Sequence, residues 1–551
     1  MNLSSKHQQN IVTYGDFTGG LNTTNVPAMI ADNQMADCTN MEFNRTTGAL
    51  QTCCGTATVF KCPDNITVDK LFYDEINNVF IFTDDNTKAV YKSSLVDIDG
   101  SHSFDRERIG FLSGNKTASA VMWDKGLLIA SGGRLQYWDG SSFGAIKITF
   151  QDEMNSYSWE SVGTSLPSGT TANDFAFDTY YTKNESYVSC NGEYYLCKEN
   201  HTSISDSPSK CNGVFVKNGR VYTWYGYRLQ CSGVGDARCW YDVSSDDSTS
   251  KWIDIGYKEG DNEQAYITGA CALSSDIVVI KNDGKIYRLA GDYPDWSLKE
   301  IARNITCINS HCFTAIQDGV FIVGREGMFF LQTTVDYGEM KPTNVANGIL
   351  SLLSTLSVEK SWVKFLPALN QIWIAGYENK FICFDLTFKA FFQRKFYSAV
   401  NDICVYKSYF MLARNHGVGE LVDGIYQDEK YSEAESDMDW EVTAKSHTDF
   451  YDFLLKRIRV AYVPLLDSFD TAQMLTAENK IHVDLSESQI KSPEIYTDNT
   501  LIVDDDSYIV PMNTQFNTKW CVYRNRMFGV KLKGQASAVM LNKVDIAVAE
   551  V

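Results

Sequence analysis

The feature that most constrains the fold is a small motif that occurs seven times along the chain. Each copy has a short apolar strand, a tight polar turn and a second strand that in most copies carries an aromatic residue. The copies begin at Val79, Leu127, Val214, Ile277, Val320, Ile372 and Phe410. Turns such as Lys217-Asn218-Gly219 and Asn282-Asp283-Gly284 tolerate the positive φ angles of a β-hairpin. Because one hairpin cannot bury its own apolar face, the series predicts a repeat fold whose units cover one another.

The spacing of the hairpins indicates which repeat fold this is. Their first strands start 48, 87, 63, 43, 52 and 38 residues apart. Most of these steps lie near the roughly 40 to 50 residues of one β-propeller blade, and the longest step must contain an insertion. The sequence therefore predicts an all-β fold with a β-propeller of about seven blades. A series of unrelated β-sandwiches is the alternative, because short alternating strands occur in any antiparallel fold.

Three regions are predicted. Residues 1–65 are rich in Asn, Thr and Gly and favour an extended N-terminal arm with apolar anchor side chains. Residues 66–426 hold the propeller, interrupted at about 144–210 by an insertion rich in Tyr, Phe and Trp. Residues 427–551 begin with an acidic connector and continue with longer alternating strands, a pattern typical of a C-terminal β-sandwich.

Two of these regions allow alternatives. The arm can lie along a neighbouring surface, or it can pack on its own propeller and close the first or the last blade. The insertion has too many aromatic residues for a free linker, so its side chains must pack on something. It can serve as a partner contact or simply enlarge a blade.

Charge and cysteine content exclude several classes of protein. The net charge of −20 argues against a chain that grips nucleic acid by its phosphates, because such binding needs clustered Lys and Arg. The same charge is compatible with DNA that passes the protein without being bound, or with a charge that serves only solubility.

The 15 cysteines are an odd number and several lie in predicted strands, which favours buried free thiols over a disulfide framework. Cys53, Cys54 and Cys62 could be read as metal ligands, but no C-x-x-C pair supports a metal site.

The chain contains no apolar run of 18 residues, and residues 1–10 lack the apolar stretch of a secretory signal. We therefore expect no membrane span and folding in a cytoplasm.

Both ends of the chain carry a recognisable pattern. The first consists of Phe17–Thr23, then Pro27, Ile30, Asp32–Gln34, Asp37–Asn40 and Gly48–Leu50. The second consists of Trp440–Thr443, Lys456-Arg457, Arg526–Leu532 and a final Val-rich strand. These patterns resemble the ends of tail hub, nozzle and head-to-tail stabilisation proteins of short-tailed (podovirus-type) bacteriophages. This chain has Thr52-Cys53-Cys54-Gly55 where those proteins usually have a basic residue and Pro-Gly, which leaves open which of them it is most similar to.

The resemblance implies a structural subunit of a phage tail that joins tail components and forms part of the DNA conduit. It implies a homo-oligomer, in the form of a hexameric ring, that contacts portal, adaptor or other tail proteins. Double-stranded DNA would pass through without specific binding, and the protein would be assembled in the host cytoplasm and end up in the virion tail. The expected assembly contacts lie in the first pattern: Phe17, Gly19, Gly20, Leu21, Asn22, Pro27 and Ile30.

Catalytic motifs are weak, and we expect no enzyme, no cofactor and no metal. His311 and Cys312 could suggest a thiol nucleophile, but neighbouring residues on a strand point to opposite faces. A glycine-rich phosphate loop is absent, since Ser232–Asp236 lacks the Lys and helix that must follow. The alternative function is a glycan-binding or glycan-cleaving propeller at a cell surface, whose paired carboxylates would be distant in sequence.

Overall fold

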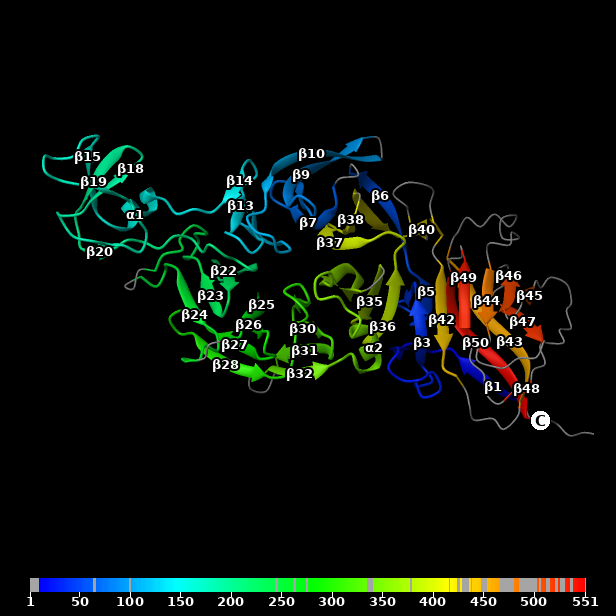
Figure 1. The fold of residues 1–551 in the computed structure, drawn as a ribbon. Helices are drawn as coiled ribbons and strands as arrows, with labels where there is room; N and C mark the ends of the chain where they lie inside the picture. Colours follow the sequence, from blue (N-terminus) through cyan, green and yellow to red (C-terminus); the bar gives the residue numbers. More distant parts are fainter. Residues whose placement is uncertain are drawn as a thin grey trace, which may run out of the picture.

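In the computed structural model the regular structure of the described residues is mainly antiparallel β-sheet, with only short helices (Figure 1). The structure describes residues 9–62, 66–98, 101–242, 246–260, 264–273, 276–333, 340–376, 379–415, 417–423, 427–428, 436–437, 439–446, 453–465, 480–484, 503–504, 507–511, 516–520, 524–525, 531–535 and 539–550. Within this part, seven four-stranded units form the blades of a β-propeller, as the hairpins predicted.

The first three blades follow one another in the sequence. Blade 1 contains β7 (Val68–Asp74), β8 (Val79–Asp84), β9 (Ala89–Ile98) and β10 (Ser101–Phe111). Blade 2 contains β11 (Ser119–Trp123), β12 (Gly126–Ala130), β13 (Gln136–Trp138) and β14 (Phe143–Ala145). Blade 3 contains β21 (Val214–Lys217), β22 (Arg220–Tyr225), β23 (Arg228–Cys231) and β24 (Lys251–Asp254).

The remaining blades complete the ring. Blade 4 contains β25 (Ile267–Ala272), β26 (Asp276–Lys281), β27 (Ile286–Ala290) and β28 (Ser297–Ala302). Blade 5 contains β29 (Phe313–Ile316), β30 (Gly319–Gly324), β31 (Gly327–Thr333) and β32 (Met340–Asn344), and is followed by η1 (Asn347–Ile349) and α2 (Leu350–Leu353). Blade 6 contains β33 (Val363–Leu366), β34 (Gln371–Ala375), β35 (Lys380–Asp385) and β36 (Ala390–Lys395), with η2 (Pro367–Leu369) between its first two strands. Blade 7 contains β37 (Val400–Tyr406), β38 (Tyr409–Arg414) and β39 (Gly417–Val422).

The fourth strand of blade 7 comes from the start of the chain. β6 (Gly55–Lys61) pairs antiparallel with β39, with Lys61 opposite Gly417 and Gly55 opposite Val422. The sequence analysis placed this strand in the N-terminal arm, because one isolated alternating run gives no sign of its distant partner. The structure corrects this boundary: residues 55–61 close the last blade, which is the second of the two alternatives for the arm.

The middle strands explain why the hairpins were visible in the sequence. β26 and β30 are buried along their whole length, since each lies inside its sheet and is covered by neighbouring blades on both faces. Such strands read as continuous apolar runs. Six of the seven hairpins join the second and third strands of a blade, but the one at Val214 joins β21 and β22, the first two strands of blade 3.

A separate apolar cluster lies between each pair of early blades. Ile81 and Val90 of blade 1 pack with Leu127 and Ile129 of blade 2, and corresponding clusters join the following blades. The ring closes through a cluster of blade 7 and blade 1 residues that includes Phe80 and Met411. The blades are therefore held by burial of apolar surface at every junction.

The insertion forms a small unit of its own at the far end of the molecule from the terminal strands (Figure 1). It contains α1 (Phe150–Ser156), β15 (Trp159–Gly163), β16 (Asn173–Asp174), β17 (Tyr180–Tyr181), β18 (Tyr187–Cys190), β19 (Glu193–Cys197) and β20 (His201–Thr202). Its main sheet has the order β15-β19-β18-β16 and pairs with no blade. Its aromatic residues pack on one another, as between Phe150 and Phe175, whose ring centroids lie 4.9 Å apart. The insertion therefore does not enlarge a blade, and its role as a partner contact stays a prediction.

The two ends of the chain share their sheets. The N-terminal strands are β1 (Gln9–Tyr14), β2 (Gly20–Leu21), β3 (Gln34–Thr39), β4 (Met41–Phe43) and β5 (Leu50–Thr52). The C-terminal strands are β40 (Gln427–Asp428), β41 (Ser436–Asp437), β42 (Trp440–Ala444), β43 (Phe453–Pro464), β44 (Lys480–Asp484), β45 (Val503–Asp504), β46 (Ser507–Pro511), β47 (Phe516–Trp520), β48 (Arg524–Asn525), β49 (Lys531–Gln535) and β50 (Val539–Glu550). β1 and β5 pair with β50, and β3 lies between β36 of blade 6 and β42. We call these strands, except β40 and β41, the terminal module; a separate C-terminal β-sandwich stays a prediction.

Candidate functional site

A cavity of about 750 Å³ lies where the first strands of several blades meet. These strands line the ring axis, with contacts between β11 and β21, β21 and β25, β25 and β29, β29 and β33, and β37 and β7. The cavity is lined by residues of five blades, among them Lys70, Thr117, His311, Trp362 and Asn401. Pockets with a few convergent polar groups are the usual binding sites of folded proteins.

Beside this cavity, a buried carboxylate joins three blades. The Asp402 side chain of β37 is 2 % exposed, and its Oδ1 lies 3.1 Å from Lys364 Nζ of blade 6 and 3.6 Å from Lys70 Nζ of blade 1. Its Oδ2 accepts a hydrogen bond from the backbone N–H of Leu71. Burial raises the pKa of Asp402, but the two ammonium groups outweigh it and hold that pKa below its usual value. The carboxylate is therefore ionised at neutral pH and serves as a link between blades.

His311 and Cys312 lie beside the same cavity but do not form a nucleophile pair. They lie in the turn before β29 and not on a strand, which corrects the premise of the sequence argument. Burial, aided by the charge of Lys70, lowers the pKa of His311 to about 3. Burial raises the pKa of Cys312 to about 12. At neutral pH both groups are uncharged, so the reactive thiolate is absent.

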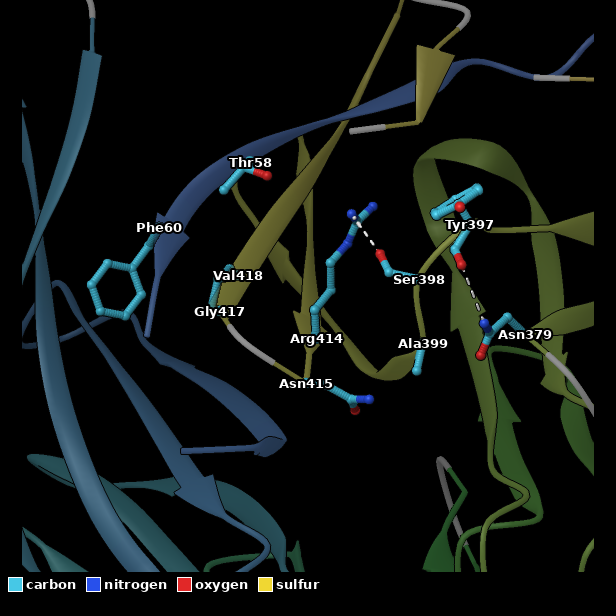
Figure 2. A pocket seen from close by; sticks show the side chains of 10 residues that line it. All are labelled: Thr58, Phe60, Asn379, Tyr397, Ser398, Ala399, Arg414, Asn415, Gly417 and Val418. Atoms are coloured by element: carbon cyan, nitrogen blue, oxygen red, sulfur yellow. Dashed lines mark hydrogen bonds between the residues drawn. The ribbon is translucent and has the colours of Figure 1, made fainter. Parts of the chain in front are cut away.

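A second pocket, of about 390 Å³, adjoins the first between blades 6 and 7, and both are lined by Asn379, Ala399 and Asn415 (Figure 2). Its most buried polar group is Arg414, which donates to Ser398 Oγ at 3.0 Å and to Thr56 Oγ1 at 2.6 Å. Figure 2 shows the guanidinium pointing toward Ser398. Since Thr56 belongs to β6, Arg414 attaches the strand that closes the ring to the connection between the last two blades.

The residues predicted as assembly contacts lie close together, and most of them are buried within this chain. Phe17, Leu21 and Ile30 are 3, 3 and 2 % exposed and pack in this chain's own interior. Asn22 is also buried and donates from Nδ2 to Gln34 Oε1. Contact of these residues with another subunit stays a prediction.

Gly19 and Gly20 allow two backbone segments to approach closely. A Cβ on Gly19 would lie 2.5 Å from Asn33 Oδ1, and one on Gly20 would lie 2.8 Å from the Cβ of Ala390 in blade 6. Gly20 also has a φ of +70°, which other residues rarely adopt. Gly20 therefore fits the segment onto blade 6, while Gly19 lets it pack against the residues before β3.

The loop between β2 and β3 also carries exposed apolar side chains that the sequence analysis did not single out. Val26 is 58 % exposed and Met29 is 78 % exposed, on either side of the half-buried Pro27. The backbone carbonyl of Pro27 accepts a hydrogen bond from Ser446 of the C-terminal part. The middle of the loop is thus attached to the C-terminal part through Pro27, while Val26 and Met29 on either side of it are exposed.

The thiols fit the sequence interpretation of buried small hydrophobes. The 14 cysteines of the described residues are free, and most of them are buried. Cys53 and Cys54 lie close to Arg394, and burial is the main reason that the pKa of each thiol is raised. Among the described residues, no group of three or more His, Cys, Asp or Glu side chains is arranged to hold a metal ion. No helix of that same part is long and apolar enough to cross a membrane.

Comparison with known proteins found similarity in three-dimensional structure only. No protein-family model and no curated protein matches the chain significantly. The structure is similar to the WD40 β-propeller domain of Doa1, with a TM-score of 0.34 and 10 % identity over 66 % of this chain and 96 % of that chain. It is also similar to the C-terminal WD40 domain of Sif2, with a TM-score of 0.36 and 7 % identity over 68 % of this chain and 99 % of that chain. The computationally designed Ika8 protein matches with a TM-score of 0.34 and 10 % identity over 66 % of this chain and 98 % of that chain.

Proposed function

We propose that the chain is a non-enzymatic structural subunit of a bacteriophage tail, in a hub, nozzle or head-to-tail connector ring. In this role the propeller is a rigid body, and the terminal module joins the subunit to its neighbours. The subunit joins tail components and forms part of the conduit through which double-stranded DNA passes.

The observation that carries the proposal is the contact between the two ends of the chain. The sequence patterns that resemble phage tail proteins lie about 400 residues apart, on either side of the propeller. In the structure Asp37, Cys38 and Thr39 of the first pattern pair with Thr443, Val442 and Glu441 of the second. Lys445 Nζ lies 2.7 Å from Asp32 Oδ1, and Asn40 donates to the backbone carbonyl of Asp439. Two patterns that meet in one module support a single shared role.

The exposed tip of the loop between β2 and β3 supports an assembly role for this module. Val26 and Met29 expose apolar side chains at the end of a loop whose neighbours Leu21 and Ile30 are buried. Exposed apolar side chains that are held in place by a fixed backbone are suited to a subunit contact. The net charge of −20 fits a conduit that DNA passes without being held.

Native mass spectrometry and electron microscopy of the purified chain test the proposal. We expect a closed ring, a hexamer by the resemblance, and incorporation of the chain into tailed particles next to the portal. The double variant Val26→Asp/Met29→Asp should fail to form the ring while keeping the melting temperature of the parent chain. Ile76→Asp is the matched control, since Ile76 is an exposed apolar residue of blade 1 at 56 %. A monomer at every concentration, and absence from particles, would refute the proposal.

A further inference from the structure

Blade 3 carries a pocket that the proposed assembly role does not use. It has a volume of about 490 Å³ and lies between the strands β22 and β23 and the segment Pro208–Lys210, which returns from the insertion. Its lining includes Trp224, Tyr225, Arg228 and Gln230. Figure 1 places blade 3 beside the insertion, on the side of the molecule opposite the terminal module.

One face of blade 3 brings aromatic and polar side chains together. Tyr225 is paired with Arg228, and Gln230 with Trp252. Because alternate residues of a strand share a face, these four side chains lie on the same side of the sheet. Tyr225 and Trp252 are 48 and 47 % exposed. Tyr225 therefore offers the pocket a partly exposed ring on which a flat ligand can stack, beside Lys210, whose Nζ lies 4.9 Å from the ring centroid.

The pocket is basic in a strongly acidic protein. The chain has 69 acidic and 49 basic residues, yet the pocket lining contains Lys210 and Arg228 and no carboxylate. Arg228 lies 3.8 Å above the ring of Trp252 and is paired with Asp254 through two hydrogen bonds of 2.8 and 3.0 Å. Lys210 donates to the Tyr225 hydroxyl at 3.0 Å, so it is the positive charge that no carboxylate of the lining balances.

Trp224 also contributes to the lining, but its side chain belongs to the other face of the sheet. It alternates with Tyr225 along β22, is 4 % exposed and packs in the apolar cluster between blades 3 and 4. The polar side of the pocket is therefore formed by Tyr225, Arg228 and Gln230, with Lys210 beside them.

We propose that this pocket binds an acidic saccharide, a sugar unit that carries a carboxylate or sulfate group. The apolar C–H face of a pyranose ring fits the exposed ring of Tyr225, and its hydroxyl groups match the amide of Gln230. The acidic group would lie beside Lys210. This inference is independent of the proposed tail role, because ring formation depends on the opposite end of the molecule.

A nucleic acid strand fits the pocket less well. Stacking on aromatic rings is common in single-strand binding, but it is combined with a track of many cations along the phosphate backbone. Here the lining has two cations, one of them paired with Asp254, and the chain as a whole carries a net charge of −20 that repels a polyanion. One sugar unit with one acidic group matches this charge distribution.

Isothermal titration calorimetry of the full chain tests the proposal with a panel of uronate and sialate oligosaccharides, with maltohexaose as the neutral probe and an oligothymidylate as the nucleic acid probe. We expect at least one acidic saccharide to bind, and maltohexaose to bind much more weakly. Tyr225→Ala should weaken the acidic saccharide about tenfold by removing the stacking ring. Lys210→Gln should weaken it and abolish most of the dependence of the affinity on salt concentration.

The matched control is Tyr409→Ala, since Tyr409 of blade 7 is 51 % exposed and lies outside the pocket. It should leave the affinity unchanged, and all three variants should keep the melting temperature of the parent chain. The proposal is overturned if no acidic saccharide of the panel binds, if Tyr225→Ala binds as the parent does, or if maltohexaose binds equally well. Tighter binding of oligothymidylate that is lost in Tyr225→Ala would identify a nucleic acid site instead. None of these outcomes depends on whether the chain forms a ring.

Discussion

Lys70 in the first strand of blade 1 and Asp402 in the first strand of blade 7 lie with Nζ and Oδ1 3.6 Å apart, at the point where the propeller ring closes. Both side chains are almost fully buried, at 6 and 2 % exposure. The pair joins the two ends of the blade series directly, beside the apolar cluster of the same junction. Loss of one partner from such a buried pair costs more free energy than the intact pair contributes, because the remaining charge is then buried without a partner.

Asp402→Asn should therefore destabilise the chain strongly. Lys70 and Lys364 would lose their common carboxylate, and the expected loss in the free energy of unfolding is about 3 to 5 kcal/mol. Chemical denaturation followed by tryptophan fluorescence measures it. The control is Lys88→Gln, which removes an exposed pair with Asp85 and should change the free energy by less than about 1 kcal/mol. Equal effects of the two substitutions would contradict a special role for Asp402.

The same carboxylate predicts a dependence of stability on pH. Lys364 and Lys70 hold the pKa of Asp402 below its value in the unfolded chain, although burial alone would raise it. The unfolded state then binds more protons as the pH falls from about 4, so Asp402 stabilises the fold above that pH and loses this effect below it. Burial raises the pKa of Glu42 and Asp69, which work in the opposite direction. Comparison of the parent chain with Asp402→Asn at each pH isolates the contribution, and the difference between them should shrink below about pH 4.

Gly20→Ala should destabilise the attachment of the N-terminal segment to blade 6. The new methyl group would lie 2.8 Å from Ala390 Cβ and from the backbone nitrogen of Phe391, at a φ of +70°. Strain and overpacking together are expected to lower the free energy of unfolding by about 3 kcal/mol. Gly235→Ala has a similar φ of +73° with no atom within 4 Å, and should lower it by only about 1 kcal/mol. Thermal unfolding of both variants separates the cost of the close contact at Gly20 from the cost of placing an alanine at a positive φ angle.

The sequence predicted the propeller because its middle strands are buried on both faces. Strands such as β26 and β30 read as apolar runs, and the turn after β26 carries a residue that positive φ requires, Gly284 with a φ of 78°. At Val214 the same signal came from the first two strands of blade 3, because β21 is nearly as apolar as a middle strand.

The strand that closes the ring and the charged cluster at the axis could not be predicted in this way. β6 has mixed burial and pairs with a strand more than 350 positions away, so nothing near it in the sequence identifies its partner. Leu71 and Asp402 are separated by 331 positions, and a single Lys or Asp carries no sign of its ion pair. The assembly contacts were predicted from a resemblance, which gives residue types but not burial. Only the structure shows that Leu21 and Ile30 are covered while Val26 and Met29 are exposed.

Glu153→Ala should loosen the insertion while leaving the propeller folded. Glu153 is fully buried, and its carboxylate accepts hydrogen bonds from Trp159 Nε1, His201 Nε2 and the backbone N–H of Ile204. Removal of the carboxylate leaves three buried donors without an acceptor, each at a cost of about 1 to 3 kcal/mol. Hydrogen exchange in residues 150–202 should become faster, with the blades unchanged. Glu160→Ala is the control, since the Glu160 side chain is 57 % exposed and pairs with Lys198 at the surface. Unchanged protection of the insertion in Glu153→Ala would show that its aromatic cluster alone maintains it.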